Sequence, residues 1–443
     1  MKKIITYGTY DMLHIGHINL LRRAKELGDY LIVGVTDEDY DRLRGKLNVL
    51  QSLEERVDAV KALDFVDEVI VEHHQFQKAA DMQKYDIDIF AIGDDWLGKF
   101  DYLNEYTKVV YLPRTKGISS TMLRADTLKT YRLGIIGTGR IARRFVKEST
   151  HLDNVEILGV MSRRLNNVET FIKENKITYG FDRVEDLLEK PIDAVYIATP
   201  HEMHYEYAKK ALLAGKHVLC EKPITLNSEH LTELYEIADA NNLVLMEAIK
   251  TAFFPGFNKL LSEIERGKIG DVIEVRASFS KLLEDKNLRE WQVPYGGAVN
   301  ELATYPLLLA QRILGTPKKT DFVTKQMNGV DGYTNIIIEH ENAISISTVG
   351  LGAKTEGCAV IAGTKGYIYV PAPWWLTKCY HIRFEDPSEE LTYKFDLEGD
   401  GLRYEISEFI SLIQRELTES ERLTREDILN INKVFSEFNN KYA

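Results

Sequence analysis

Residues 131–148 read YRLGIIGTGRIARRFVKE, in which an apolar strand runs into a glycine-rich turn and then a helix. The same order opens the chain, where residues 2–28 read KKIITYGTYDMLHIGHINLLRRAKELG. A strand, a turn with glycine and a helix are typical of the start of a parallel α/β domain. The chain of 443 residues is therefore predicted to be an α/β protein in which two such domains begin independently.

The stretches that follow each beginning differ along the chain. Up to about residue 250, strands alternate with helices, which predicts parallel, Rossmann-like sheets with helical crossovers. Beyond it, stretches such as DVIEVRASFS and YHIRFED have strand composition without helices between them, which predicts a mainly antiparallel open sheet before two closing helices. We expect three domains, residues 1–129, 130–250 and 251–443, with residues 122–130 as a helix joining the first two tightly.

The composition is that of an ordinary globular protein and excludes several partners. Hydrophobic residues make up 44%, charged residues 28%, and the formal net charge is -12. An acidic chain repels nucleic acid and anionic membranes, so any phosphate site has to be built locally. The three cysteines are widely spaced and form no metal or disulfide motif, so no metal site is predicted. With neither a signal peptide nor a membrane span in sight, we predict a cytoplasmic protein.

Two histidines at the start of the first helix form the first candidate site. His14 and His17 follow the first strand, where a helix N-terminus offers unpaired N–H groups and the positive end of its dipole. Such an end binds phosphate, and two imidazoles there can stabilise developing charge. The pair alone fits an ordinary surface feature equally well. RTKGISST at residues 114–121 and RGK at residues 44–46 add cations and hydroxyls, which favours a phosphate site.

Five motifs in order over residues 1–124, namely GTYDMLHIGH, SLEER, FVDEVIV, IGDDWLGKFDYL and LPRTKGISST, resemble the glycerol-3-phosphate cytidylyltransferases of the HxGH nucleotidyltransferase superfamily. The resemblance implies transfer of CMP from CTP, with Mg²⁺, to a phosphorylated alcohol and release of pyrophosphate. It implies catalytic roles for His14, His17, Lys46 and Arg114. The CTP site that it implies consists of Gly8, Thr9, Tyr10, His14, His17, Lys46, Asp94, Arg114, Thr115, Ser119 and Ser120.

Two positions depart from the glycerol-phosphate pattern. Asp64 stands where the family tends to have arginine, and Gln75 or Phe76 where it has tryptophan. Replacing a cation by a carboxylate near an acceptor phosphate is not conservative. We therefore hypothesise that the acceptor is a longer polyol phosphate, whose hydroxyls could bond to aspartate and glutamine.

The turn GTGRIA, residues 137–142, is the second candidate site. Its glycines allow a tight turn and a close approach of pyrophosphate, and Ala142 allows close helix packing. Where an acidic residue would hold the ribose of NAD, at the end of the next strand, the chain has Ser162, Arg163 and Arg164. A hydroxyl and a guanidinium suit a 2′-phosphate, which favours NADP(H) and leaves NAD(H) possible. Arg164 also fits a solvated surface charge.

Lys222, in Glu221-Lys222-Pro223, stands at the end of a strand on the edge where doubly wound sheets bind ligands. A lysine there can bond to a substrate oxygen and move a proton as hydride is transferred. The same three residues would also fit an exposed turn. GTGRIA, ATPHEMH, EKP, MEAIKTAFFPGF, IGDVIEV and YGGAVNELATYP, in this order from Tyr131 onward, resemble the glucose–fructose oxidoreductase, inositol dehydrogenase and MocA family.

That resemblance implies an NAD(P)-binding Rossmann domain and a domain with an open sheet that covers the nicotinamide. Lys222 falls on the family's catalytic lysine, Tyr305 on its acid or base, and Glu301 on a position where aspartate is usual. Lys250 fits either a substrate phosphate contact or a strand-end charge. The implied cofactor site consists of Gly137, Thr138, Gly139, Arg140, Ile141, Ser162, Arg163, Thr199, Pro200, His204, Glu221 and Lys222.

The fusion itself predicts consecutive reactions. An NADPH-dependent reduction of a sugar phosphate would give a polyol phosphate, and CMP transfer would give a CDP-polyol for a cell-wall or capsular polymer. One alternative keeps the two activities independent, with glycerol 3-phosphate as acceptor and an unrelated sugar or cyclitol as redox substrate. Another makes one half a binding module, against which His14, His17, Lys222 and Tyr305 argue. Both families commonly form oligomers, so a homodimer or homotetramer is expected.

Overall fold

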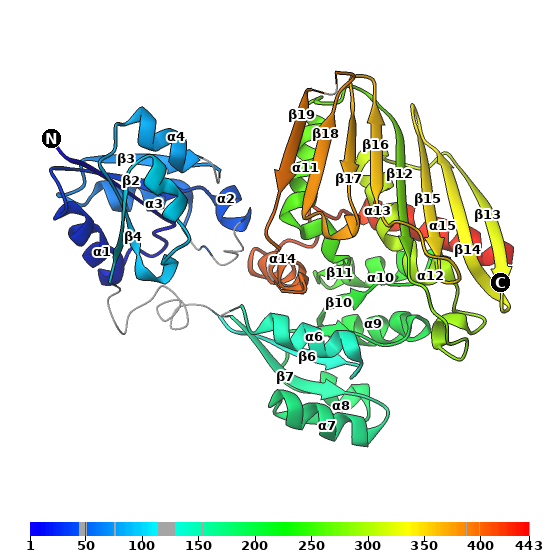
Figure 1. The fold of residues 1–443 in the computed structure, drawn as a ribbon. Coiled ribbons are helices and arrows are strands. Elements are labelled where there is room, and N and C mark those ends of the chain that lie inside the picture. The colour runs from blue at the N-terminus through cyan, green and yellow to red at the C-terminus, as the bar shows by residue number, and fades with distance from the viewer. Residues whose placement is uncertain are drawn as a thin grey trace. The chain divides into compact units, whose positions relative to one another are not determined.

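The structure is a computed structural model that describes residues 1–43, 49, 51–74, 77–113, 129–152, 154–386, 388–397 and 399–442. The chain divides into two compact units, shown in Figure 1. The first consists of Met1–Thr130 with Leu152–Asn154, and the second of Tyr131–His151 with Val155–Ala443. The joining helix predicted over residues 122–130 lies outside the described residues except for its last two. The three domain ranges stay a prediction.

The first unit contains a parallel five-stranded sheet with the order β3-β2-β1-β4-β5. Each predicted strand forms, and the helix predicted from SLEERVDAVKAL is α3. A capping box of Ser52 and Glu55 begins that helix. The elements are β1 (Lys3–Gly8), α1 (Ile15–Lys25), β2 (Tyr30–Thr36), α2 (Glu38–Leu43), α3 (Leu53–Lys61), β3 (Glu68–Glu72), α4 (Gln77–Lys84), β4 (Ile89–Gly93), η1 (Asp94–Trp96), η2 (Asp101–Glu105) and β5 (Lys108–Leu112).

The sheet of the first unit is buried on both faces. Ile4 and Leu31 point to a core shared with Leu21 of α1, whereas Ile5 and Phe90 belong to the core on the opposite face. Neighbouring residues of a strand point to opposite faces, so a sheet covered on both sides needs continuous apolar runs such as KIITY and YLIVGV. The alternation of strand and helix in the sequence therefore predicted this layering correctly.

The second unit begins with a parallel six-stranded sheet of order β11-β10-β9-β6-β7-β8. This arrangement confirms the predicted Rossmann fold. Its elements are β6 (Tyr131–Ile136), α6 (Arg140–Ser149), β7 (Val155–Met161), α7 (Leu165–Asn175), β8 (Tyr179–Phe181), α8 (Val184–Leu188), β9 (Ala194–Ile197), η3 (His201–Met203), α9 (His204–Leu213), β10 (His217–Glu221), α10 (Ser228–Ala240) and β11 (Leu245–Ala248).

An eight-stranded sheet of order β13-β14-β15-β12-β16-β17-β18-β19 follows. Only the β12–β15 pair is parallel, which confirms the predicted mainly antiparallel sheet. The remaining elements are η4 (Lys250–Phe253), α11 (Pro255–Glu265), β12 (Val272–Ser280), η5 (Arg289–Trp291), α12 (Ala298–Leu302), α13 (Thr304–Leu314), β13 (Lys319–Met327), β14 (Val330–Glu339), β15 (Ile344–Gly350), β16 (Ala359–Gly363), β17 (Tyr367–Val370), η6 (Trp374–Leu376), β18 (Cys379–Arg383), β19 (Glu390–Lys394), α14 (Leu402–Gln414) and α15 (Arg425–Tyr442).

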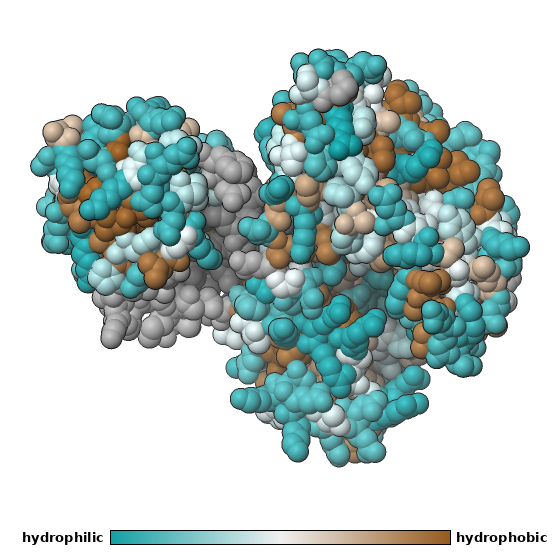
Figure 2. Space-filling model, viewed as in Figure 1, coloured by the Kyte–Doolittle hydropathy of each residue, from teal (hydrophilic) through white to brown (hydrophobic). Residues whose placement is uncertain are grey.

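One face of the large sheet is covered by helices and the other is open. Helix α13 packs on β12, and α15 packs on α13, behind the strands in Figure 1. The register of the strands puts Val323, Ile344 and Tyr367 on one face, the open one, and their exposed fractions are 61%, 42% and 37%. Figure 2 shows hydrophobic residues gathered over this sheet. None of the helices that the structure describes is long and apolar enough to cross a membrane.

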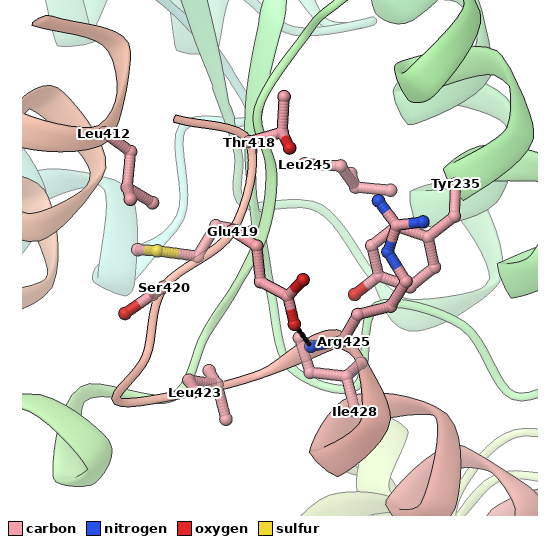
Figure 3. A pocket seen from close by; sticks show the side chains of 10 residues that line it. Tyr235, Leu245, Leu412, Thr418, Glu419, Ser420, Leu423, Arg425 and Ile428 are labelled. Carbon is pink, nitrogen blue, oxygen red and sulfur yellow. Dashed lines mark hydrogen bonds between the residues drawn. The ribbon is translucent and has the colours of Figure 1, made fainter. Parts of the chain in front are cut away.

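A small pocket lies between α10, β11 and the loop that precedes α15 (Figure 3). The guanidinium of Arg425 closes it, 4.5 Å from the centre of the Tyr235 ring, and binds the carboxylate of Asp239 at 2.6 and 2.7 Å. The backbone N–H of Arg425 donates to Glu419 at 2.7 Å. Leu245, at the start of β11, also lines the pocket, which therefore lies away from the carboxyl ends of the strands. These contacts anchor the start of α15 to helix α10 of the Rossmann domain.

Candidate active sites

The strand order of each parallel sheet brings its candidate residues together. In the first unit β1 lies between β2 and β4, and in the second unit β6 lies between β7 and β9. The pairs that matter are β1 with β4 and β6 with β9. The connections from the two strands of each pair leave in opposite directions, which opens a crevice at the carboxyl ends of the pair. The turns after β1 and β4 therefore meet at one edge, and the turns after β6 and β9 meet at another.

His14 and His17 sit at the N-terminus of α1, as predicted. Nδ1 of His14 caps the helix, accepting hydrogen bonds from the backbone N–H groups of Gly16 at 3.1 Å and His17 at 3.4 Å. The two imidazoles are stacked, with ring centres 3.8 Å apart. Because Nδ1 of His14 accepts, the proton of the neutral ring sits on Nε2. That nitrogen is then a donor for a phosphate at the helix end.

A buried arginine holds the turn that follows β1. Arg56 of α3 is fully buried, and its guanidinium donates to the backbone carbonyls of Thr9 at 2.8 Å, Thr36 at 2.7 Å and Gln51 at 3.1 Å. The hydroxyl of Thr9 donates to Asp41 at 2.7 Å, and Asp41 lies 3.6 Å from Arg56. Thr9 can therefore meet CTP chiefly through its backbone.

The other predicted CTP residues differ in how the structure places them. The ring of Tyr10 is buried against Gly8, and its centre lies 5.5 Å from that of the His17 ring. Tyr10 therefore packs edge-on against the histidine pair. Asp94 is exposed at the start of η1, at the carboxyl end of β4. Lys46, Arg114, Thr115, Ser119 and Ser120 lie outside the described residues.

The position of Asp64 corrects one interpretation. This residue is exposed in the turn before β3, so it lies at the amino ends of the strands, opposite the histidine edge of its own unit. Its carboxylate therefore does not replace a cation beside that edge. Gln75 and Phe76 come after β3 in the sequence and lie outside the described residues. His73, directly after β3, has its Nδ1 2.6 Å from the carboxylate of Asp37, and Asp37 follows β2 at the same edge.

The glycine-rich turn after β6 has the geometry of a dinucleotide site. Gly137 has φ +116°, and a side chain there would place Cβ 2.3 Å from the carbonyl oxygen of Ala198. At Gly139, which caps α6, a Cβ would meet open space. Among the described residues no side chain caps α6, so its first N–H groups suit a pyrophosphate. Thr199, in the adjoining turn, has a buried hydroxyl without a hydrogen-bond partner in the described structure.

The residues that would meet the adenosine ribose lie at the end of β7. Ser162 is half-buried, and the side chains of Arg163 and Arg164 are exposed beside it. In the glycine-rich turn Thr138 is half-buried and Arg140 is exposed, and the Thr138 carbonyl accepts from Arg143 at 2.7 Å. These residues fit a nicotinamide dinucleotide, and their charge suits an additional phosphate on the ribose.

Four side chains converge where the catalytic lysine was predicted. Nζ of Lys222 donates to the backbone carbonyl of Glu301 at 2.9 Å. The carboxylate of Glu301 lies 2.9 Å from Nε2 of His201 and 2.9 Å from Nη2 of Arg289. Burial alone raises the pKa of Glu301, but the hydrogen bond and charge interaction with His201 and the charges of Lys222 and Arg289 lower it to about 2. Burial lowers the pKa of His201, so a neutral imidazole orients an ionised carboxylate.

Tyr305 lies on the other side of Lys222. Nζ of Lys222 is 5.9 Å from the Tyr305 ring centre, and Phe279 of β12 packs between Tyr305 and Trp375 at 5.4 and 4.0 Å. Burial raises the pKa of Tyr305, and the carboxylates of Glu221 and Glu405 raise it further. Tyr305 therefore keeps its proton at neutral pH, so it can donate but not accept one.

Lys250 and His204 turn inward rather than toward open space. Nζ of Lys250 donates to the backbone carbonyl of Asp400 at 2.9 Å, and its charge lowers the pKa values of the half-buried Glu221 and the buried Glu405, which desolvation raises. These contacts favour the structural alternative for Lys250. The ring nitrogens of His204 lie 2.8 Å from the carbonyl of Pro223 and 2.9 Å from that of Thr199. His204 thus joins the lysine turn to the turn that carries Thr199.

Comparison with known families agrees with this geometry. Residues 5–126 match the cytidylyltransferase-like family. Residues 131–249 match the oxidoreductase family with an NAD-binding Rossmann fold, and residues 257–369 match the GFO/IDH/MocA C-terminal domain. The chain belongs to both families. It is thus a cytidylyltransferase joined to a Gfo/Idh/MocA oxidoreductase.

Relatives of each part are similar over nearly their whole length. Glycerol-3-phosphate cytidylyltransferase of Bacillus spizizenii is 53% identical over 126 residues, which cover 28% of this chain and 97% of that protein. Trans-1,2-dihydrobenzene-1,2-diol dehydrogenase of Bos taurus is 30% identical over 302 residues, covering 65% of this chain and 90% of that protein. Both parts of this cytidylyltransferase–oxidoreductase are therefore enzymes by family.

Solved structures share the fold of the oxidoreductase part. KijD10, a 3-ketoreductase from Actinomadura kijaniata in complex with NADP and TDP-benzene, has a TM-score of 0.63 at 24% identity, over 69% of this chain and 96% of that one. Levoglucosan dehydrogenase in complex with NADH and levoglucosan has a TM-score of 0.63 at 18% identity, over 71% of this chain and 98% of that one. The fold thus carries a nicotinamide cofactor of either kind.

Sequence reasoning missed three members of these sites. Arg56 lies in the quoted motif SLEER and His201 in ATPHEMH, so both had a signal in the sequence. Arg289 belongs to no motif, and its place at the site is seen only from the contact that it makes from η5 with Glu301 of α12. Among the residues that the structure describes, no group of histidine, cysteine, aspartate and glutamate could hold a metal ion.

Proposed function

We propose that this cytidylyltransferase–oxidoreductase makes a CDP-polyol in two consecutive reactions. The oxidoreductase part reduces a sugar phosphate to a polyol phosphate, and the cytidylyltransferase part then transfers CMP from CTP to it. The observation that carries this proposal is the union, in one chain, of a cytidylyltransferase similar to enzymes for an alcohol phosphate with an oxidoreductase whose Lys222, Glu301 and Tyr305 converge. Reduction of a carbonyl creates the alcohol that the first unit's family accepts as a phosphate ester.

In the reduction, NADPH supplies the hydride when it is bound. Lys222 holds the substrate carbonyl and gives its proton to the oxygen that becomes the alcohol. The backbone carbonyl of Glu301, 2.9 Å away, aims the ammonium group. Tyr305 keeps its proton because burial raises its pKa, so it donates a second hydrogen bond to the same oxygen. Arg163 beside the ribose favours NADPH over NADH.

In the transfer, a phosphate oxygen of the acceptor attacks the α-phosphorus of CTP in line with the departing pyrophosphate. The chain contributes position and charge. His14, fixed by its cap on α1, donates through Nε2 to the CTP phosphates, and the N-terminus of α1 adds its dipole. Mg²⁺ would enter with the CTP phosphates, since it usually binds through substrate oxygens and few protein ligands.

A coupled assay tests the proposal. The chain is incubated with NADPH, CTP, Mg²⁺ and a panel of triose, pentulose and hexose phosphates, and NADPH absorbance and pyrophosphate are followed together. We expect one substrate to drive both signals, with pyrophosphate appearing only after NADPH is consumed. If no substrate drives both, the two reactions are not consecutive. Lys222→Met is the matched control, because it should abolish both signals while CMP transfer to added polyol phosphate persists.

A second candidate keeps the reactions independent, with glycerol 3-phosphate as the acceptor. The 53% identity to a glycerol-3-phosphate cytidylyltransferase favours it. Asp64 is no argument against it, because this residue lies at the edge of the sheet opposite the histidines. The acceptor panel separates the two candidates. Glycerol 3-phosphate as the best acceptor, with no redox substrate that feeds it, would support independence.

We further propose that the chain acts in the cytoplasm, where CTP and NADPH are made, in the synthesis of a cell-wall or capsular polymer. The open face of the large sheet, with Val323 and Ile344 exposed, suits contact with a second copy in a homodimer or homotetramer. Light scattering of the chain and of Ile344→Glu tests the assembly. An unchanged mass for the variant would exclude this face as the contact.

A further inference from the structure

The guanidinium of Arg289 lies at the catalytic cluster but is only partly used by it. Nη2 of Arg289 is 2.9 Å from Glu301 and 3.4 Å from His201. The side chain is 41% exposed. Nε and Nη1 of Arg289 donate to no protein acceptor in the described part of the chain. A guanidinium has five N–H donors in a planar fork, so this residue can bind a second anion beside Glu301.

The segment that carries Arg289 is held rigidly. Trp291 of η5 is buried, and its ring receives Nζ of Lys286 3.4 Å from its centre. The neighbouring Glu290 accepts from Nζ of Lys281 at 3.4 Å. Lys281 follows β12, directly after the strand that carries Phe279 against Tyr305. The arginine is therefore positioned before any substrate arrives, which lowers the entropic cost of binding.

Arg289 supplies the exposed positive charge of this cluster. Glu301 is ionised, and both Lys222 and Arg289 are cations that contact it. The charge of Lys222 also acts on Glu221 and Glu247, whose pKa values it lowers. In the described part of the chain, Arg289 contacts no carboxylate other than that of Glu301. Arg289 is therefore the cation of this cluster that remains open to an anionic group of the substrate.

Glu301 also sets the spacing between the two cations. Its backbone carbonyl accepts from Lys222, and its carboxylate contacts Arg289. One glutamate side chain therefore separates Lys222, at the reacting end of the site, from Arg289, at the end that can bind an anion. An aspartate would bring the two ends closer by one methylene. This spacing suits a substrate whose anionic group is a few carbons away from its carbonyl.

We propose that Arg289 binds the phosphate ester of the substrate during the reduction. This inference rests on the proposed function, because the first unit needs a product that still carries its phosphate. The phosphate takes no part in the hydride transfer, so its contact with Arg289 contributes to affinity and orientation. The carbonyl end is then delivered to Lys222. Arg289 is accordingly a substrate-binding residue that also touches Glu301.

Paired substrates test this assignment. KM and kcat for NADPH oxidation are measured with the sugar phosphate found in the panel and with the same sugar lacking its phosphate. The wild-type chain is compared with Arg289→Gln, Arg289→Lys and the exposed control Arg276→Gln, whose side chain pairs with Glu274 on another part of the sheet. We expect Arg289→Gln to raise KM for the phosphorylated sugar roughly 10–100-fold. KM for the unphosphorylated sugar should rise much less than KM for the phosphorylated one, and inorganic phosphate should inhibit the variant less.

Each other outcome has a definite meaning. If Arg289→Gln lowers kcat equally for both sugars, the arginine only positions Glu301, and the inference is overturned. An unchanged KM for both sugars overturns it as well. If the wild-type chain reduces no sugar phosphate at all, the proposed function fails at its own step, before the variant is compared. Arg289→Lys should be intermediate, because an ammonium keeps the charge but loses the fork.

Discussion

Replacing Arg56 should destabilise the first unit and disable CMP transfer while the oxidoreductase part keeps working. The side chain is fully buried, and it joins three segments by donating to the carbonyls of Thr9, Thr36 and Gln51. It also neutralises the buried Asp41 at 3.6 Å. Arg56→Met removes the cation and leaves these acceptors in place, so the desolvation cost of each is no longer offset.

The magnitude follows from the burial of the ion pair. Removing one member of a buried pair costs about 3–5 kcal/mol, because the partner charge stays buried. In a unit of this size, each kcal/mol lowers the melting temperature by roughly 3 °C, so a fall of about 10–15 °C is expected. Thr9 and Tyr10 follow β1 beside the histidines, and their displacement should cost about 100-fold in CMP transfer.

Calorimetry of the full chain gives the readout for each unit. CTP should shift the transition of the first unit and NADP that of the second, because a ligand stabilises the fold that binds it. Arg56→Met should lower only the CTP-sensitive transition. Lys61→Met, an exposed position on the same helix, is the matched control and should change neither transition.

Two results would refute this reasoning. The first is a CTP-sensitive transition that moves by less than about 3 °C, since the buried contacts would then contribute little. The second is an equal fall in both transitions, because Arg56 contacts only its own unit in the described structure. Loss of CMP transfer with normal stability would instead place Arg56 directly on the nucleotide.

Four further predictions concern three single side chains. Burial raises the pKa of Glu247 to about 8, so its contribution to stability, present below pH 4.5, is lost as the pH rises toward 8; Glu247→Gln should flatten this decline in denaturation at pH 5 and 8, and parallel curves would contradict it. Glu301→Gln should lower kcat for NADPH oxidation about 10–100-fold, since two charge-assisted contacts are lost; wild-type turnover would exclude a catalytic role. The pKa of Glu301 is lowered to about 2, so its stabilising contribution, present above pH 4.5, should disappear as the pH falls toward 2; acid denaturation of the wild-type chain and of Glu301→Gln measures this loss. His14→Ala should slow pyrophosphate release about 100–1,000-fold at unchanged NADPH oxidation; a comparable fall in both rates would point to misfolding.

Local patterns in the sequence were enough for the architecture and for part of each site. The strand, turn and helix at residues 131–148 form β6 and α6, and Gly137 has the positive φ that its turn requires. His14 caps α1 because it stands where the apolar pattern of a strand ends and the apolar pattern of a helix begins. Lys222 follows β10 directly. Each of these features depends on a few consecutive residues, so the order of residues carries it.

Other features depended on residues far apart in the chain. Asp64 was interpreted as a neighbour of the acceptor, yet the direction of β3 places it at the opposite edge of the sheet. Lys250 offered two alternatives until the fold placed the backbone carbonyl of Asp400, 150 residues later, within 2.9 Å of its ammonium group. No periodicity relates such positions, because their distance is set by how the layers pack.

The sequence by itself determined the two families, the glycine-rich turn at residues 137–142, the histidine pair at the start of α1 and the residue types available for chemistry. Only the tertiary structure decided that Arg289 and His201, 88 residues apart, share the carboxylate of Glu301. It also decided the protonation of the site, since burial and neighbouring charge set the pKa values of Glu301, His201 and Tyr305. Backbone turns depend on a few consecutive residues, whereas burial and long-range contacts exist only once the chain has folded.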